Sequence, residues 1–350
     1  KGRKQTMAAA EKILIRAPNW LGDAVMAIPA MAAVRRAYRD RALTLAAAPS
    51  IAPLFHEITP VAPDQILTVD KTTETATLRA AGAGRAILFP NSFRTAWGSR
   101  QAGIRERWGY GTHGRSLILT RAVRRPRHTV HQAEYYLHLV RELGIETPEG
   151  PPLARIEISE PTRRRVLELL EQHRLDTSAP LVGIAPGAAY GHAKRWPPER
   201  AAELAGRLTA RGASIVLVGA AGDRGAGREI ESSVPAGVRI VNLIGRTDLR
   251  LFAGLLAACH AFVSNDSGAM HLAAAAGVPV VAIFGPTDER VTAPLGDHDV
   301  IIHQVFCRPC MLRDCPIDHR CMRGIGVDVV FDAVCRRLDR RARPAEDPGA

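Results

Sequence analysis

The segment from Phe262 to Asp288 most constrains what this chain can fold into. It reads FVSNDSGAMHLAAAAGVPVVAIFGPTD, in which two apolar runs, 261–264 and 278–284, flank a stretch of small residues. That order predicts strand, turn, helix and strand, a βαβ unit of a parallel sheet. The turn falls where the helix begins, and the unpaired N–H groups and the dipole of a helix start favour an anion. The segment therefore predicts a site for a phosphate-bearing, hydroxyl-rich ligand, unless Asp266 or Ser267 only caps the helix.

Apolar runs and amphipathic stretches alternate along most of the chain. Predicted strands lie at 12–16, 43–47, 66–69 and 85–89, and again at 181–185, 214–218, 238–242 and 261–264. Helical patterns between them indicate an α/β fold with two Rossmann-like, doubly wound domains. We place an N-terminal domain at 7–160, an interdomain region at 161–180, a C-terminal domain at 181–326, and a helix with a frayed tail at 327–350. Ligands bind beyond the carboxyl ends of strands in such sheets, so we expect one cleft that both domains share.

The net charge limits the partners. Lys and Arg number 47 against 35 Asp and Glu, which gives +12 and suits nucleic acid, an anionic membrane surface or a phosphorylated substrate. Nine arginines lie between Arg94 and Arg127 against one acid, Glu106. Such a run is usually a solvated face, although Arg favours bidentate phosphate recognition. Aromatic residues make up only 5%, which argues against a stacking platform for single-stranded nucleic acid. No apolar run reaches the length of a membrane span, so we expect a cytoplasmic protein, peripheral to the membrane.

Two further loops carry candidate chemistry. The first, Trp20-Leu21-Gly22-Asp23, follows the first predicted strand. Asp23 could act there as a general base if it lies in the cleft, or it could cap the next helix. The second loop, 186–197, contains Gly187 and ends in Lys194 and Arg195 before a helix start. Either cation could neutralise a phosphate leaving group, or the loop could be a solvated basic turn. The glycine-rich turn 219–227 does not match the dinucleotide pattern G-x-G-x-x-G, and no P-loop occurs in the sequence.

Four cysteines and a histidine cluster near the C-terminus. They are Cys307, Cys310, Cys315, His319 and Cys321. Thiolates this close could hold a structural zinc ion or an iron–sulfur cluster, although the spacing does not fit the common zinc templates. The alternative is reduced, unliganded cysteines, because a cytoplasmic setting argues against disulfides.

The motifs together resemble a known family. LIRAPNWLGDAVMAIPAM, PNSFRTAW, PGAAYGHAKRWPPERAAELA, the opening segment and CRPC…CPIDHRCM make the chain, from about Ile13 to Cys321, similar to the ADP-heptose:lipopolysaccharide heptosyltransferases. The stretch Asn-Ser-Phe-Arg and the cysteine segment resemble the second enzyme of that family more than the first. The resemblance implies a GT-B glycosyltransferase and transfer, with inversion, of L-glycero-D-manno-heptose from ADP-L-glycero-D-manno-heptose, without a cofactor. The implied acceptor is the first heptose of the lipopolysaccharide inner core, on Kdo2-lipid A, at the cytoplasmic surface of the inner membrane. Nucleic acid is not implied as a partner.

The resemblance also implies residue roles. Asp23 corresponds to the family's general base, and Lys194 to a lysine that contacts the donor. Asp266 would hold the donor sugar hydroxyls. The implied donor-binding set is completed by Ser267, Gly268, Ala269, His271, Gly187, Gly245 and Thr247, and the acceptor contacts by Arg94 and His128. We expect Asp23 to take a proton from the attacking hydroxyl while Lys194 and the helix start oppose the charge that builds on ADP.

Other functions fit parts of this pattern. A related heptosyltransferase could act on the first or third core position, or on a protein. A catalytically silent ADP-heptose-binding protein would not need both Asp23 and Lys194. A nucleic-acid-binding function rests on charge alone, because no recognised DNA- or RNA-binding motif occurs in the sequence.

Overall fold

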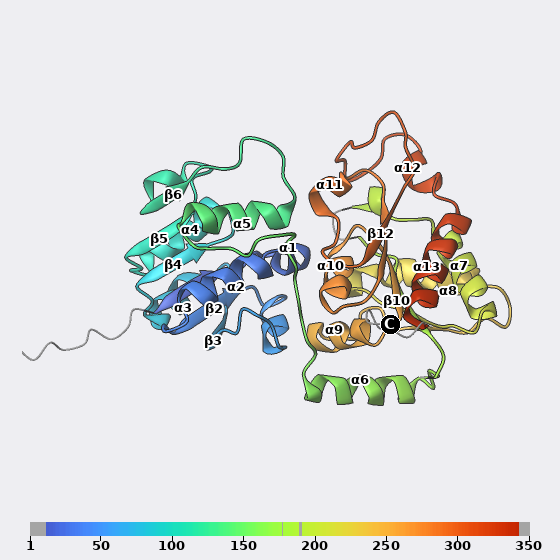
Figure 1. Cartoon of the computed structure of the whole chain (residues 1–350). Coiled ribbons are helices and arrows are strands. Elements are labelled where there is room, and N and C mark those ends of the chain that lie inside the picture. Colours follow the sequence, from blue (N-terminus) through green and yellow to red (C-terminus); the bar gives the residue numbers. More distant parts are fainter. Residues whose placement is uncertain (1–11, 177, 189–190, 343–350) are drawn as a thin grey trace, which may run out of the picture. The chain divides into compact units, whose positions relative to one another are not determined.

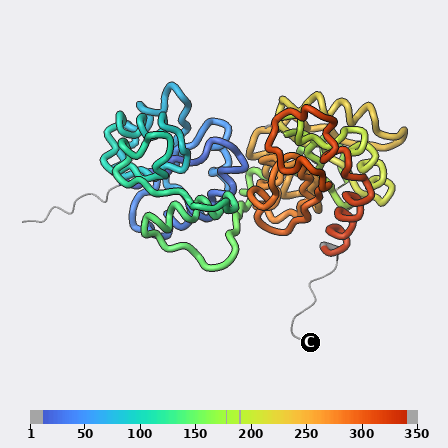
Figure 2. The backbone as a smooth tube through the Cα atoms, turned by 90° about the horizontal axis from the view of Figure 1, so that it is seen from above, coloured from blue at the N-terminus to red at the C-terminus, as the bar shows by residue number. Residues whose placement is uncertain are grey.

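A computed structural model describes residues 12–176, 178–188 and 191–342 of the chain. The chain divides after Ala154 into two compact units (Figure 1). Each unit is formed by one continuous stretch of sequence, in blue to green for the first and in yellow to red for most of the second (Figure 2). Met7 and the predicted tail beyond residue 342 lie outside the described residues.

The first unit is built on one six-stranded sheet in the order β3-β2-β1-β4-β5-β6. All neighbouring strands run parallel. Its strands are β1 (Ile13–Arg16), β2 (Leu43–Ala47), β3 (Gln65–Thr68), β4 (Arg85–Leu88), β5 (Glu106–Tyr110) and β6 (Arg121–Val123). Its α-helices are α1 (Leu21–Met26), α2 (Ile28–Ala37), α3 (Glu74–Ala81), α4 (Phe93–Gln101) and α5 (Gln132–Glu142).

The helical segment that follows β1 is broken near Pro29. Helix α1 ends at Met26, and α2 begins at Ile28 with Pro29 in its first turn. A proline is tolerated there because the first-turn N–H groups have no partner within the helix. Strand β1 is fully buried at the centre of the sheet, which follows from its unbroken apolar sequence up to Arg16.

The arginine-rich segment 94–127 contains α4, β5 and β6, which the sequence did not reveal. Charged side chains help to hold β5, which is one reason why its sequence does not read as a strand. Arg85 on β4 pairs with Glu106, and its guanidinium carbon lies 4.0 Å from the ring centre of Trp108. The interpretation of the whole segment as a solvated face is wrong for Arg115. Its side chain is fully buried and donates to the carbonyl oxygen of Pro90.

The second unit repeats the arrangement of the first. Its parallel sheet has the order β12-β11-β10-β7-β8-β9, so both sheets have the doubly wound order 3-2-1-4-5-6 when strands are counted within each unit. The strands are β7 (Leu181–Ala185), β8 (Ser214–Leu217), β9 (Ile240–Asn242), β10 (Ala261–Asn265), β11 (Val280–Phe284) and β12 (His298–Ile302). The α-helices are α6 (Glu160–Gln172), α7 (Pro198–Ala210), α8 (Arg224–Ser233), α9 (Leu249–Ala257), α10 (Gly268–Ala275), α11 (Glu289–Thr292), α12 (Arg320–Arg323) and α13 (Val327–Ala342).

The predicted βαβ unit is confirmed as β10, α10 and β11, with Phe262 opposite Val280 in the register. Helix α6, in the segment expected to join the domains, packs against α9 within the second unit. Helix α13 packs against α7, and its buried residues Val330 and Val334 join the core of this unit. The predicted C-terminal helix thus packs with an apolar face against its own unit.

Candidate functional site

Most of the predicted site residues follow the two central strands of their sheet. The strand order reverses between β1 and β4 in the first unit, and between β7 and β10 in the second. Asp23 follows β1 and Arg94 follows β4, whereas Lys194 follows β7 and the turn 266–268 follows β10. Ligands in open α/β sheets bind outside the carboxyl ends of the strands at such reversals. Each unit therefore carries its candidate residues where a ligand is expected.

In the second unit the structure brings Lys194 and Asp266 into direct contact. The Lys194 Nζ atom lies 2.5 Å from Asp266 Oδ2, and the two residues are only 9% and 7% exposed. Thr287 donates a hydrogen bond of 2.7 Å to the same oxygen. Two charges this deeply buried persist only when paired, so the pair fixes the position of both side chains. Thr287, which the sequence analysis missed, directly follows the apolar run of β11 and a Gly-Pro turn.

Asn265 ties the two loops of this site together. Its Nδ2 donates to the carbonyl oxygen of Pro186 at 2.7 Å, and its Oδ1 accepts from the Trp196 backbone N–H at 3.2 Å. The loop after β7 is thereby fixed to the end of β10. The sequence feature that could have identified Asn265 is its position, because it is a polar residue at the end of an otherwise apolar buried strand.

The start of α10 is not capped by a side chain. Ser267 occupies the N-cap position without such a hydrogen bond, and its Oγ instead lies 3.1 Å from Ser264 Oγ. Asp266 is held by Lys194 and Thr287. The simple helix-cap explanation of these two residues is therefore wrong, and the N-cap side chain leaves the first-turn N–H groups, which include those of Gly268 and Ala269, uncapped. His271 lies one turn further along and is buried.

The predicted glycines Gly187 and Gly245 sit where other groups of the second unit approach closely. A Cβ on Gly187 would come within 2.1–2.3 Å of the carboxylate atoms of Asp223. Gly245 has φ of +69°, and a Cβ there would lie 2.7 Å from the Cα of Ala221. The positive φ and the backbone contact exclude a side chain at Gly245, whereas a side chain at Gly187 would displace the Asp223 carboxylate. Thr247 is half-buried just before α9.

In the first unit Asp23 is half-buried and faces helix α5. Its Oδ1 accepts hydrogen bonds from Tyr136 Oη at 2.9 Å and from Gln132 Nε2 at 3.1 Å. Burial raises the pKa of Asp23 above its ordinary value, and these two hydrogen bonds partly oppose the rise. The N-cap of α1 is Trp20, so the alternative of Asp23 as a cap is wrong. A carboxylate with a raised pKa at a strand end is suited to accept a proton near neutral pH.

A buried ion-pair cluster supports this end of the sheet, and the sequence analysis missed it. Arg16 Nε lies 2.6 Å from Glu74 Oε1, and both side chains are 2% exposed. Arg94 Nη1 lies 2.7 Å from the other carboxylate oxygen, while its own side chain is 44% exposed. Glu74 therefore anchors the predicted acceptor residue Arg94 and leaves part of its guanidinium accessible. The sequence feature that could have identified this cluster is Arg16, a charged residue at the end of an apolar strand.

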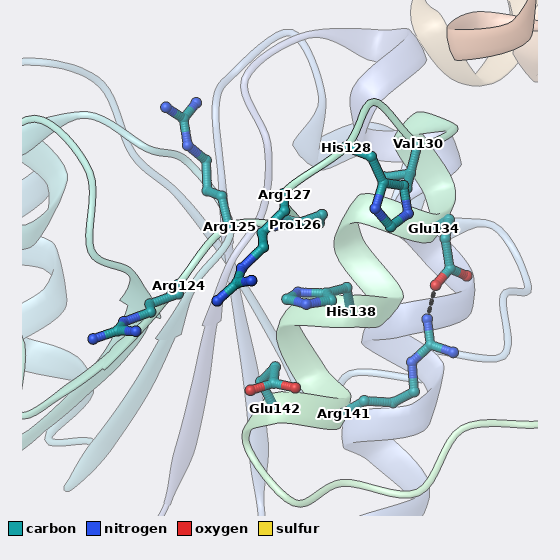
Figure 3. Close-up of a pocket in the computed structure, with 10 residues that line it drawn as sticks. All are labelled: Arg124, Arg125, Pro126, Arg127, His128, Val130, Glu134, His138, Arg141 and Glu142. Carbon is teal, nitrogen blue, oxygen red and sulfur yellow. Dashed lines mark hydrogen bonds and ion pairs between the residues drawn. The ribbon is translucent and has the colours of Figure 1, made fainter.

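His128, the other predicted acceptor residue, is exposed in the loop after β6. It lines a pocket with residues from α5 (Figure 3). The pocket uses Glu134 and His138 of α5, whereas Asp23 contacts Gln132 and Tyr136. The structure thus places Arg94 and His128 in the same unit without joining them in one cluster.

The expected zinc or iron–sulfur site is not supported. Over residues 12–176, 178–188 and 191–342, no three His, Cys, Asp or Glu side chains are arranged to hold a metal ion. Cys321 is buried on α12, whereas Cys307, Cys310 and Cys315 are only half-buried, and Cys315 Sγ accepts the His319 backbone N–H at 3.3 Å. All four cysteines are free. Although these cysteines are close in the sequence, their side chains are not arranged as the ligands of one metal ion.

The described part of the chain contains no helix that combines the length and the apolar character needed to cross a membrane.

Two Rossmann-like units in one chain are the architecture of the GT-B class of glycosyltransferases, and the charged residues lie where such sheets bind ligands. Comparison with known proteins agrees. The model of glycosyltransferase family 9 (heptosyltransferase) matches residues 75–320. Lipopolysaccharide heptosyltransferase 2 of Escherichia coli K12 is 30% identical over 311 residues, which are 84% of this chain and 88% of that protein. Lipooligosaccharide heptosyltransferase 2 of Haemophilus influenzae is 34% identical over 228 residues, 63% of this chain and 65% of that protein.

The solved structure of E. coli ADP-heptose lipopolysaccharide heptosyltransferase II superposes with a TM-score of 0.82 at 29% identity. The match covers 95% of this chain and all of that one. The chain therefore belongs to glycosyltransferase family 9, and it is a glycosyltransferase. The GT-B fold implied by the sequence resemblance is confirmed.

Proposed function

We propose that this chain transfers L-glycero-D-manno-heptose from ADP-heptose to the first heptose of the lipopolysaccharide inner core, with inversion. The names of its relatives support heptose transfer to lipopolysaccharide. The observation that carries the proposal is the half-buried Asp23, whose raised pKa and fixed Oδ1 suit a general base. The buried Lys194–Asp266 pair supplies the donor side.

Asp23 acts on the acceptor in this mechanism. Its Oδ1 is held by Tyr136 and Gln132, so Oδ2 takes the proton from the acceptor hydroxyl. The acceptor oxygen attacks the anomeric carbon from the face opposite the leaving group. The bond from that carbon to the ADP oxygen breaks, and ADP leaves with the electron pair, which inverts the anomeric centre.

Lys194 and the start of α10 act on the donor. Negative charge grows on the diphosphate as the glycosidic bond breaks, and a buried ammonium group with uncapped helix N–H groups stabilises it without reorganisation. Asp266 Oδ2 already accepts from Lys194 and Thr287, so we assign Oδ1 to the sugar hydroxyls. Gly187 and Gly245 bring backbone close enough to line the nucleotide.

Substituting Tyr136 tests the base. Tyr136→Phe removes a hydrogen bond that lowers the pKa of Asp23, so that pKa should rise further. Because the base must be ionised, we expect the acidic limb of the kcat/KM profile to move to higher pH, with rates converging in alkali. Tyr135→Phe is the matched control, since its hydroxyl contacts Asn91 instead. An acidic limb that is the same in Tyr136→Phe and wild type would argue against Asp23 as the base.

The acceptor is tested with ADP-heptose and defined truncated lipopolysaccharides, followed by mass analysis of the products. We expect one heptose to be added to heptosyl-Kdo2-lipid A and none to Kdo2-lipid A. Addition to Kdo2-lipid A, to a longer core or to a protein would replace this acceptor by one of the alternatives. ADP-heptose binding without any product would indicate a silent binding protein.

Since the proposed acceptor carries a lipid, we also infer peripheral contact with the cytoplasmic surface of the inner membrane.

A further inference from the structure

A basic pocket lies on the first unit between the loop after β6 and helix α5 (Figure 3). Its volume is about 460 Å³, which falls within the range of small-molecule sites, about 300–1,000 Å³. Four arginines and two histidines line it against two glutamates, Glu134 and Glu142. A site of this size suits a charged head group better than a polymer.

The positive charge of the pocket is not compensated. Glu134 forms an ion pair with Arg141, which leaves Glu142 as the other acid in a lining that also contains Arg124, Arg125 and Arg127. Arg124 and Arg127 have no ion-pair partner among the residues that the structure describes. Guanidinium groups present several donors in one plane and match the oxygens of a phosphate. An anion with several oxygens is therefore the expected ligand.

His138 adds an acceptor whose orientation is fixed. Tyr110 Oη donates to the Tyr135 carbonyl oxygen at 2.5 Å and lies 3.0 Å from His138 Nδ1. The hydroxyl has only one proton, so Nδ1 must carry the proton of the second hydrogen bond. Figure 3 shows the His138 ring and the Arg127 guanidinium pointing toward one another across the pocket. Nε2 of this ring is thereby left as an acceptor for a hydroxyl group of a ligand.

Helix α5 connects this pocket to the candidate base. Gln132 and Tyr136 are four residues apart and hold Asp23. Glu134 and His138 are also four residues apart and line the pocket. Residues at this spacing share one face of a helix, so α5 presents Asp23's partners on one face and the pocket on another. A group bound in the pocket is held by the same rigid element that orients Asp23.

We propose that this pocket binds a phosphate monoester, borne either by the saccharide of the acceptor glycolipid or by a phospholipid head group. The proposal rests on the proposed function for its ligand source, but anion binding itself does not depend on it. Arg124 and Arg127 recognise the phosphate, His138 Nε2 accepts from a hydroxyl group of the same ligand, and bound phosphate orients the acceptor relative to Asp23.

The direct test is calorimetric titration of the full chain with glycerol 3-phosphate. Removing two charge-assisted contacts in Arg124→Ala/Arg127→Ala should weaken binding at least about ten-fold. Arg36→Ala/Arg39→Ala is the matched control, because it removes the same charge from exposed positions of the same unit. Equal affinity in the pocket variant and the control, or no binding to wild type, would overturn the proposal, whether or not the chain transfers heptose.

Two further arms identify the source of the phosphate. If the acceptor carries it, the pocket variant should raise KM for a phosphorylated, deacylated acceptor about ten-fold, with kcat and the KM for ADP-heptose unchanged, and should leave the dephosphorylated acceptor unaffected. If a phospholipid carries it, the variant should lose co-sedimentation with phosphatidic acid vesicles but keep its KM for the deacylated acceptor. An equal rise of KM for phosphorylated and dephosphorylated acceptors, with vesicle binding intact, would contradict both.

Discussion

Asp23→Asn is expected to lower kcat of heptose transfer by about 10²- to 10⁴-fold, the range that a positioned general base contributes. The side chain keeps its shape, and Asn Oδ1 can still accept from Tyr136 and Gln132. It cannot take a proton from the acceptor hydroxyl. The measurement is single-turnover transfer with saturating ADP-heptose, so that product release does not limit the rate.

Stability provides the control for this variant. Burial raises the pKa of Asp23 in the folded chain above its unfolded value of 3.8, so ionisation at neutral pH disfavours the folded state. The penalty is present above the raised pKa and vanishes below the unfolded pKa. Asp23→Asn should therefore keep or increase Tm at neutral pH. Asp40→Asn is the matched control, because the Asp40 side chain is 93% exposed. Near-normal transfer by Asp23→Asn, in a folded protein, would remove the base assignment.

Much of the fold followed from the sequence because apolar runs and turn residues act locally. The βαβ unit at β10–α10–β11 was predicted from its two apolar strands and small-residue helix. Strands β5 and β6 could not be predicted in the same way. Their arginines are held by tertiary contacts such as Arg85 with Glu106, which a local pattern does not contain.

The candidate site was predicted residue by residue but not as a set of contacts. Asp23, Lys194 and Asp266 were identified individually, whereas the partners that give them their properties come from distant positions in the chain. Tyr136 is 113 residues from Asp23, and Lys194 is 72 residues from Asp266. The cysteine cluster shows the converse, because closeness in the sequence did not give a metal site.

Lys194→Met is expected to have the second large effect, on both stability and heptose transfer. It leaves the Asp266 carboxylate buried without its cation, and such a loss costs about 3–5 kcal/mol of unfolding free energy. Transfer should fall by about 10²- to 10³-fold as well, because a positioned group that stabilises the leaving diphosphate is gone. Arg165→Met is the matched control. Its ion pair with Asp248 is about half exposed, so we expect a change within about 1 kcal/mol.

The double variant Lys194→Met/Asp266→Asn separates folding from chemistry. Replacing the unpaired Asp266 carboxylate should restore most of the stability, because an apolar and a neutral polar side chain can replace a buried ion pair at little net cost. It should not restore transfer, since the ammonium group that faces the diphosphate is still missing. Urea unfolding gives the first quantity, and ADP titration with single-turnover transfer gives the second. Recovery of transfer in the double variant would show that Lys194 acts only on the position of Asp266 and not on the leaving group.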